Sequence, residues 1–240
     1  MEYIGHDSRM TAYTVHDGKS PTILFVHGSG SSHSAWSDLF ERLPYRLVGI
    51  DLSGHGYSED VETDPGPEAL QVYGEDVVAV ANATDTDVLA GHSLGGAVVQ
   101  HVTVDTSFSP SALLLIGTGA KLAVREDIRE ELEAEIATAP PQSEWDPSVS
   151  DADAHPVVRH RDFLTCHTFD NRARLDEITV PAIAITGEND EMTFPWYHEY
   201  LADNLPDCKL SIIPNAAHSA YQDRPDEFAT EVISFIDQLS

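Results

Sequence analysis

The amino-acid sequence predicts an α/β protein with a mostly parallel β-sheet and helices on both faces. Short apolar runs alternate with longer segments whose apolar residues recur at helical spacing, and the connections between them are short. The chain has 240 residues, of which 41% are hydrophobic. This length suits one domain with its own core and a small insertion.

The individual elements follow from these two patterns. Alternating polar and apolar side chains predict a strand at 9–16, at the edge of the sheet, followed by a turn at Asp17-Gly18. Continuous apolar runs predict buried strands at 22–26, 46–51, 87–90, 112–116, 182–186 and 209–213. Apolar residues at helical spacing predict helices at 34–43, 67–83, 94–104, 195–205 and 225–239.

The alternation stops in the segment 119–179. Residues 121–138 predict a strongly charged helix with a narrow apolar face, and residues 156–168 predict a second helix after a polar stretch. We interpret this segment as a cap inserted after a core strand. The predicted organisation is a core of residues 1–118 and 180–240 with a small helical cap at 119–179.

The charge of the chain is strongly negative. Forty-one Asp and Glu residues face 13 Lys and Arg residues, which gives a net charge of −28. The acids are spread along the whole length, and self-repulsion of this size is tolerable where molar salt shortens the Debye length to about 3 Å. We therefore expect a protein of a salt-accumulating, halophilic organism. Nucleic acid and anionic membranes are disfavoured as partners because no basic patch is available to meet phosphate.

The sequence also favours a cytoplasmic protein. Its two cysteines, Cys166 and Cys208, do not suggest a disulfide framework. No apolar stretch reaches the roughly 18 residues that a membrane span needs. The first residues lack the basic and apolar regions of a signal peptide.

Ser93 is the leading candidate for a catalytic nucleophile. It lies in GHSLG at 91–95, between a predicted strand and a predicted helix. A serine on such a sharp turn, with glycine two residues before and after it, is the nucleophile elbow. The turn strains the serine backbone and leaves no room for flanking side chains.

A serine nucleophile needs a base, and the base needs an acid to orient it. His218 follows the strand 209–213, and Asp190 follows the strand 182–186, so both lie where parallel strands end. The chain order Ser, Asp, His is the order that accompanies this elbow. The alternative histidines are His92, His27 and His55, and the alternative carboxylates are Glu188 and Glu191.

The negative charge of a tetrahedral intermediate needs hydrogen-bond donors. The backbone N–H of Leu94, at the first turn of a helix, is one candidate. The backbone N–H of Ser29 is the second, because the glycine-rich loop HGSG at 27–30 follows a buried strand upstream of the elbow.

With these motifs in view, the chain resembles the α/β-hydrolase superfamily over nearly its whole length. The matching segments are HGSG at 27–30, DLSGHGYS at 51–58, GHSLGG at 91–96, GEND at 187–190, and His218 followed by RPDEF at 224–228. The resemblance implies an eight-stranded sheet and a helical cap over the serine. It also implies Ser93 as nucleophile, His218 as base, Asp190 as acid, and Ser29 and Leu94 as oxyanion-hole positions.

The resemblance is closest to small capped esterases, so we expect hydrolysis of a small carboxylic ester through an acyl-serine intermediate. Hydrolysis of a lactone, a thioester or a carbon–carbon bond, and cofactor-free perhydrolysis, use the same three residues. A receptor on the same fold that binds a small molecule without catalysis is an alternative of another class. The sequence leaves the oligomeric state open.

No cofactor or metal ion is expected. The chain has neither a dinucleotide fingerprint nor a phosphate-binding loop, and the acidic segment 151–155 lacks the glycine and distal glutamate of a calcium loop. Five further side chains remain open between core and pocket wall: Trp145, Phe163, Leu164, His167 and Tyr221.

Overall fold

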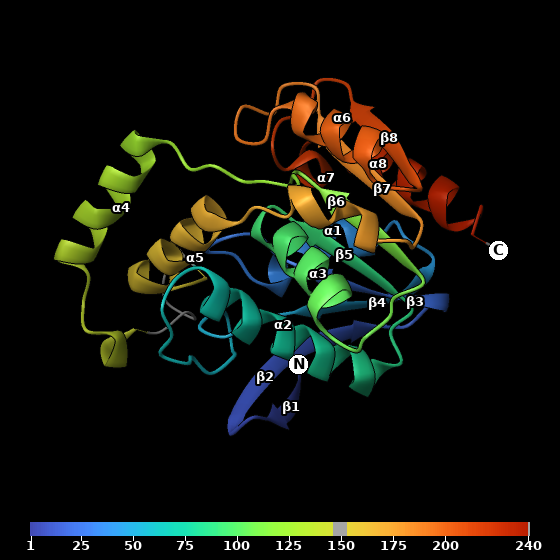
Figure 1. The fold of residues 1–240 in the computed structure, drawn as a ribbon. Helices are drawn as coiled ribbons and strands as arrows, with labels where there is room; N and C mark the ends of the chain where they lie inside the picture. Colours follow the sequence, from blue (N-terminus) through green and yellow to red (C-terminus); the bar gives the residue numbers. More distant parts are fainter. Residues whose placement is uncertain (146–152, 240) are drawn as a thin grey trace.

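A computed structural model describes residues 1–145 and 153–239. In these ranges the chain forms one eight-stranded sheet with the order β1-β2-β4-β3-β5-β6-β7-β8 (Figure 1). The strands are β1 (Glu2–His6), β2 (Arg9–His16), β3 (Lys19–Val26), β4 (Tyr45–Ile50), β5 (Val88–His92), β6 (Ala112–Ile116), β7 (Ala182–Gly187) and β8 (Cys208–Ile213).

The pairing of the strands confirms a mostly parallel sheet. From β4 through β3, β5, β6 and β7 to β8, each neighbouring pair is parallel, whereas β1 and β2 pair antiparallel, as do β2 and β4. The carboxyl ends of six strands therefore meet at one edge of the sheet. In open α/β sheets this is the edge where ligands bind.

The prediction that strand 9–16 lies at the edge of the sheet is wrong. β1 is the edge strand and pairs with β2, and the two form a hairpin joined by Asp7 and Ser8. Both turn residues have positive φ, at 45° and 66°. The pairs Asn-Gly and Asp-Gly signal such a turn in a sequence, because glycine adopts positive φ readily. Asp-Ser lacks this glycine, so the turn is not visible in the sequence.

The helices form two layers on the sheet. They are α1 (Ser37–Phe40), α2 (Pro67–Thr84), α3 (Leu94–Asp105), α4 (Glu126–Thr138), α5 (Pro156–Thr168), α6 (Pro195–Asn204), α7 (Ala220–Asp223) and α8 (Pro225–Ile236), with 3₁₀ helices η1 (His33–Trp36), η2 (Gln142–Glu144) and η3 (Arg172–Glu177). Side chains of α2, α3 and α6 join the core on one face of the sheet. Side chains of α1, α7 and α8 join the core on the other face.

Two predicted helices differ most from the observed ones. The predicted helix 34–43 is a 3₁₀ turn followed by the short α1, and it stops before Pro44, which disfavours helical backbone at the preceding residue. The predicted helix 121–138 begins at Glu126, where Glu126 and Asp127 place negative charge at the helix N-terminus. Lys121 instead forms an isolated β-bridge with Asp170.

The predicted cap segment 119–179 contains α4, α5, η2 and η3. Figure 1 shows α4 and α5 beyond the same end of the sheet, with α4 outermost. α5 packs against α2 and α3 as well as against α4. The division of the chain into a core and a cap domain stays a prediction.

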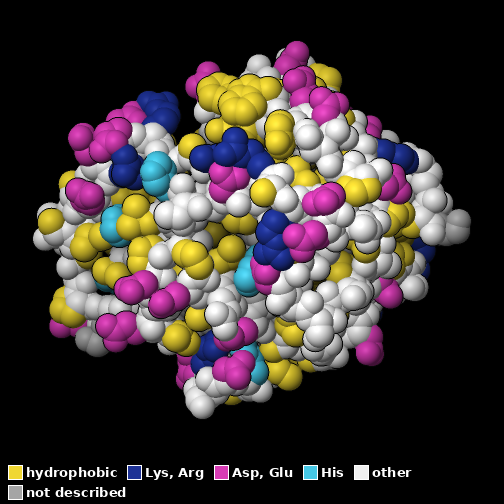
Figure 2. All heavy atoms as spheres, viewed as in Figure 1, with side chains coloured by type: hydrophobic (Ala, Val, Ile, Leu, Met, Phe, Trp, Pro, Cys, Tyr) yellow, Lys and Arg dark blue, Asp and Glu magenta, His cyan; other side chains and the backbone are white. Residues whose placement is uncertain are grey.

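None of the helices in the described ranges is both long and apolar enough to cross a lipid bilayer. Figure 2 shows Asp and Glu side chains spread over the visible face, with fewer Lys and Arg side chains among them.

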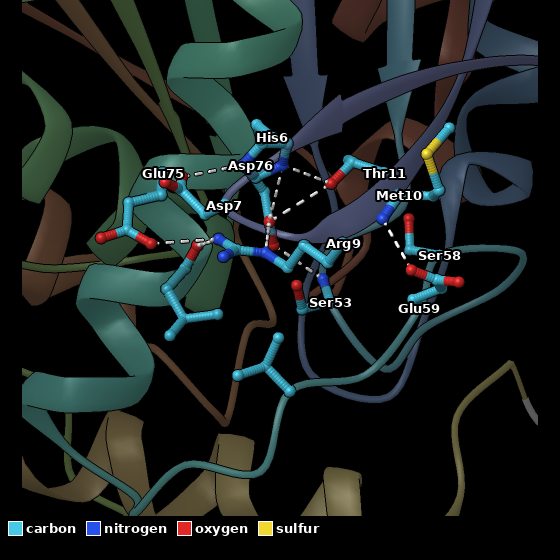
Figure 3. Close-up of polar contacts among 12 residues, drawn as sticks. His6, Asp7, Arg9, Met10, Thr11, Ser53, Ser58, Glu59, Glu75 and Asp76 are labelled. Carbon is cyan, nitrogen blue, oxygen red and sulfur yellow. Dashed lines mark hydrogen bonds and ion pairs between the residues drawn. The ribbon is translucent and has the colours of Figure 1, made fainter.

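A buried carboxylate ties the N-terminal hairpin to the rest of the fold. Asp76 lies on α2 and is fully buried (Figure 3). Its carboxylate accepts hydrogen bonds from Arg9 Nε at 2.9 Å and from the Ser53 backbone N–H at 2.8 Å. His6 Nε2 lies 3.3 Å from the same carboxylate, which raises the pKa of His6 through this hydrogen bond. Asp76 therefore connects β1, β2 and the loop after β4.

Replacing Asp76 with alanine is expected to lower the free energy of unfolding by about 3 to 5 kcal/mol, because it leaves the buried Arg9 guanidinium without its main partner. The matched control is Glu75→Ala, which removes a half-exposed carboxylate 3.1 Å from the same guanidinium. That control should cost less than about 1 kcal/mol. Denaturant unfolding followed by circular dichroism measures both, and equal losses in the two variants would contradict the prediction.

Candidate active site

Ser93 lies between β5 and α3 in a strained backbone conformation, with φ 54° and ψ −113°. Gly91 and Gly95, on either side of Ser93, are required because a larger residue would clash with the backbone. A Cβ atom at Gly91 would lie 2.2 Å from the Gly95 carbonyl oxygen, and one at Gly95 would lie 2.3 Å from the Val26 carbonyl oxygen. Backbone packing therefore has no room for side chains at 91 and 95, as the sequence predicts for a nucleophile elbow.

Neighbouring elements hold the Ser93 backbone in place. Its N–H donates to the Ile116 carbonyl at 2.9 Å. The hydroxyl of Thr118, just beyond β6, donates to the Ser93 carbonyl at 2.9 Å. The strain at Ser93 is thus balanced by hydrogen bonds on both sides of the residue.

The structure joins His218 and Asp190 by a hydrogen bond of 2.9 Å between His218 Nδ1 and Asp190 Oδ2. The ionised carboxylate accepts, so Nδ1 carries the proton and the lone pair of Nε2 is left for another donor. His218 comes from the loop after β8, and Asp190 comes from the loop after β7. Their sequence-predicted partnership is therefore present in the geometry.

Asp190 is buried and held ionised. Its Oδ1 accepts the backbone N–H groups of Met192 and Thr193, each at 2.8 Å, and its Oδ2 accepts the Thr193 hydroxyl at 2.8 Å. Burial alone would raise the pKa of Asp190, but His218 and the Thr193 donors outweigh it and hold that pKa well below its usual range. A negatively charged carboxylate therefore contacts His218 Nδ1 at neutral pH.

His92 holds the backbone of His218 in position. Its Nε2 lies 3.1 Å from the His218 carbonyl oxygen and donates to it, and the two ring centroids are 4.7 Å apart. Burial and the neighbouring His218 lower the pKa of His92 to about 3, so the His92 ring is neutral. His92, one of the alternative candidates for the base, therefore holds the backbone of the loop that carries His218.

Ser93 and His218 line one small cavity of about 40 Å³. Its other lining residues are Ser29, Leu122, Ala123, Val124, Phe163, Cys166, Met192 and Thr193. Within residues 1–145 and 153–239, no hydrogen bond joins the Ser93 hydroxyl to the His218 ring. Catalytic hydrogen bonds are often long without substrate and tighten when it binds.

The two candidate oxyanion donors are backbone groups near this cavity. Leu94 is the first residue of α3, so its N–H has no partner within the helix. Among the described residues, neither the Leu94 N–H nor the Ser29 N–H donates a hydrogen bond. Two free donors beside a serine at a helix N-terminus are what an oxyanion would need.

The rival residues lie elsewhere. His27 is fully buried, donates from Nδ1 to the Gly28 carbonyl and accepts the Leu52 N–H at Nε2. His55 is also buried and bonds to Asp162. Glu188 accepts the Asn215 N–H, and Glu191 is exposed, so neither carboxylate takes the place of Asp190 beside His218.

The side chains left open between core and pocket wall take different places. Phe163 lines the cavity, whereas Trp145 packs edge-on against His155. His167 Nδ1 accepts the Val124 N–H at 3.3 Å. Tyr221 is buried between Trp36 and His92, at ring-centroid distances of 4.4 and 5.1 Å.

In the described ranges, no three His, Cys, Asp or Glu side chains lie together as a metal ion would require. Asp151 and Ala152 of the acidic segment 151–155 fall outside those ranges.

From the sequence, His92 was offered only as an alternative base, and Thr193 and Asp162 were not named as parts of the site. Thr193 lies three residues after Asp190, and at this spacing an Asp carboxylate can accept the backbone N–H of the turn that follows it. This partner of Asp190 could therefore have been predicted from the sequence. The roles of His92 and Asp162 depend on contacts across the fold.

The comparisons with known proteins agree on one kind of protein. The model of a family described as "Alpha/beta hydrolase family" matches residues 23–231. A putative carbamate hydrolase RutD of Agrobacterium fabrum is 27% identical, over 92% of this chain and 94% of that protein. A pimeloyl-[acyl-carrier protein] methyl ester esterase of Neisseria meningitidis is 26% identical, over 90% and 93%. A solved structure of a thermophilic esterase superposes with a TM-score of 0.79 and 25% identity, over 100% of this chain and 98% of that one.

Proposed function

Because the chain belongs to the alpha/beta hydrolase family and is a carboxylesterase-like enzyme, we propose that it cleaves a small carboxylic ester through an acyl-Ser93 intermediate. The observation that carries the proposal is the hydrogen bond from His218 to the buried Asp190, beside the cavity that Ser93 lines. A receptor without catalysis would have no use for an ionised carboxylate behind a histidine in this position.

Acylation starts with attack of Ser93 Oγ on the ester carbonyl carbon. His218 Nε2 takes the serine proton as the new C–O bond forms, and Asp190 stabilises the resulting imidazolium. The carbonyl oxygen becomes an oxyanion that the Ser29 and Leu94 N–H groups receive. The tetrahedral intermediate then collapses, the bond to the alcohol oxygen breaks, and His218 gives its proton to the leaving alcohol.

Deacylation repeats these steps with water. His218 Nε2 takes a proton from a water molecule, whose oxygen attacks the acyl carbonyl carbon. The same two N–H groups receive the second oxyanion. Collapse breaks the bond to Ser93 Oγ, which recovers its proton from His218, and the carboxylic acid leaves.

The size of the cavity supports a substrate with a short group on one side of the ester. A single water needs a cavity of about 10 to 15 Å³. The cavity of about 40 Å³ therefore has room for only a few non-hydrogen atoms. Its walls at Leu122, Val124, Phe163 and Met192 are apolar, which favours a short, uncharged group.

We propose that a second hollow receives the rest of the substrate. It has about 360 Å³, shares Ala123 with the small cavity, and is lined by Trp196, Tyr197 and Tyr200. We therefore place the bulkier half of the ester toward these aromatic side chains.

Two ester series test this substrate class. One lengthens the acyl group of p-nitrophenyl esters from acetate to octanoate, and the other lengthens the alcohol of acetate esters over the same range. In at least one series kcat/KM should fall by roughly tenfold or more with length, because each extra methylene must overfill a packed site. That series identifies the half that enters the cavity.

The matched variant is Phe163→Ala, which enlarges the cavity and should flatten the series that falls in the wild type. Flat profiles in both series for the wild type would contradict a small cavity as the reacting site. Absence of turnover with every ester would instead favour one of the other acyl-transfer substrates.

A further inference from the structure

One face of the cap helix α5 packs onto the loop that carries the candidate oxyanion donor Ser29. Asp162 Oδ2 accepts the Gly30 backbone N–H at 3.0 Å, and Cys166 Sγ lies 3.7 Å from the Ser29 hydroxyl. Arg159 lies so close that a Cβ atom at Gly30 would be 2.4 Å from its Cγ. The spacing 159, 162 and 166 places these three side chains along one side of the helix.

Asp162 itself is held from two other elements of the core. It is fully buried and accepts hydrogen bonds from His55 Nε2 at 2.8 Å and from the Tyr73 hydroxyl at 2.6 Å. His55 lies in the loop after β4, and Tyr73 lies on α2. One carboxylate therefore connects the cap helix, the loop after β4, α2 and the loop 27–30.

The groups around Asp162 favour its charged form: burial alone would raise its pKa, but His55, the Tyr73 hydroxyl and the Gly30 N–H outweigh burial and lower it. His55 Nδ1 faces the Ser53 carbonyl at 3.1 Å while its Nε2 faces Asp162, so both ring nitrogens lie within hydrogen-bond distance of an oxygen acceptor. Burial opposes the charge on His55, but Asp162 outweighs it and raises the His55 pKa. The bond from Gly30 is thus a charge-assisted one, roughly twice as strong as a neutral bond.

We propose that Asp162 is a positioning residue that holds the Gly30 N–H and thereby aims the neighbouring Ser29 N–H at the oxyanion. This inference rests on the proposed function, in which Ser29 supplies one of the two donors. The cap then does more than cover Ser93, because its helix also fixes half of the oxyanion hole.

The local backbone explains why such a support is needed. Gly30 has φ +66°, and a glycine accepts either sign of φ with little cost. A peptide beside it can therefore rotate unless something holds its N–H. A misplacement of about 1 Å at a catalytic group can cost about 100-fold in rate. Asp162, fixed by His55 and Tyr73, supplies the missing constraint.

Asp162→Ala tests the proposal against Arg161→Met. Arg161 is the neighbouring buried residue of α5, and it donates to Tyr73, Asp60 and the carbonyls of Val61 and Ser53. Its loss loosens the same cap contact without touching the loop 27–30. For p-nitrophenyl acetate, Asp162→Ala should lower kcat roughly 10- to 100-fold with KM within about threefold of the wild type, because the lost alignment acts in the transition state. Arg161→Met should keep kcat within about twofold.

A second readout separates positioning from general loosening of the cap. 1,1,1-Trifluoroacetone adds to a catalytic serine as a hemiketal whose oxyanion occupies the same hole as the tetrahedral intermediate. Its inhibition constant should rise in Asp162→Ala by the factor by which kcat/KM falls. In Arg161→Met the inhibition constant should stay near the wild-type value.

Asp162→Asn keeps the experiment decisive if the alanine variant does not fold. Its amide oxygen can still accept the Gly30 N–H without charge, so kcat should lie between the wild-type and alanine values, roughly 3- to 10-fold down. Equal kcat and inhibition constants in the Asp162 variants and Arg161→Met would overturn the proposal while leaving ester hydrolysis intact. A wild type that neither hydrolyses esters nor binds the ketone would instead refute the proposed function.

Discussion

Ser93→Ala is expected to lower kcat for p-nitrophenyl acetate by roughly 10⁵- to 10⁶-fold, the largest effect of any single replacement in this chain. The alanine fits the strained turn without new contacts, since it removes only the hydroxyl oxygen. The loss therefore measures the covalent route through the acyl-enzyme. Steady-state kinetics in molar KCl, which screens the net charge of −28, provides the measurement.

Ser111→Ala is the control for this replacement. Ser111 precedes β6, at the opposite edge of the sheet from the elbow, and its hydroxyl donates to the Asp87 carbonyl. Its kcat should equal that of the wild type. If Ser93→Ala turned over the ester within tenfold of the wild type, Ser93 would have no covalent role.

Asp190→Asn is expected to lower kcat by about 10⁴-fold, because it gives His218 the wrong tautomer. The N–H groups of Met192 and Thr193 both point at Oδ1, so the amide oxygen of the asparagine takes that place. Its NH₂ group then faces His218 Nδ1, which must accept. The proton moves to Nε2, where the ring can no longer receive the proton of Ser93.

Glu188→Gln is the matched control, since it neutralises an exposed carboxylate of the same loop that does not contact His218. Its kcat should stay within about twofold of the wild type. Comparable losses in the two variants would mean that the loop needs negative charge in general, and the assignment of Asp190 as the partner of His218 would be wrong.

Local sterics and strand order made much of this architecture predictable. The glycines at 91 and 95 are required by backbone contacts close in the fold, and such glycines are visible in a sequence as a motif. Asp190 and His218 follow predicted strands, and parallel strands bring their carboxyl ends to one edge. The contact between Asp190 and His218 could therefore be predicted from the positions of the two residues after parallel strands.

The features that the sequence analysis missed depend on contacts that no local pattern encodes. Asp162 stands beside Arg161 in a polar stretch of α5 that is typical of a solvated surface, yet both side chains are buried. Its hydrogen bond to Gly30 spans 132 residues. Likewise, residues 121–125 were predicted as part of one helix with α4 but stay outside it, and Leu122 and Val124 line the small cavity.

The hairpin at the N-terminus was missed for a different reason. β1 has only five residues, and its turn at Asp7 and Ser8 uses side chains that rarely adopt positive φ. The strand is held by pairing with β2 and by Asp76 on α2, a buried carboxylate about 70 residues away in the sequence that no local pattern reveals.

Mass spectrometry after treatment with a fluorophosphonate tests most directly whether His218 activates the hydroxyl of Ser93. The wild type should gain one phosphonyl group per chain, located on the peptide that contains Ser93, and His218→Gln should react far more slowly. No modification of the wild type, or modification at a different residue, would contradict a serine nucleophile in this cavity.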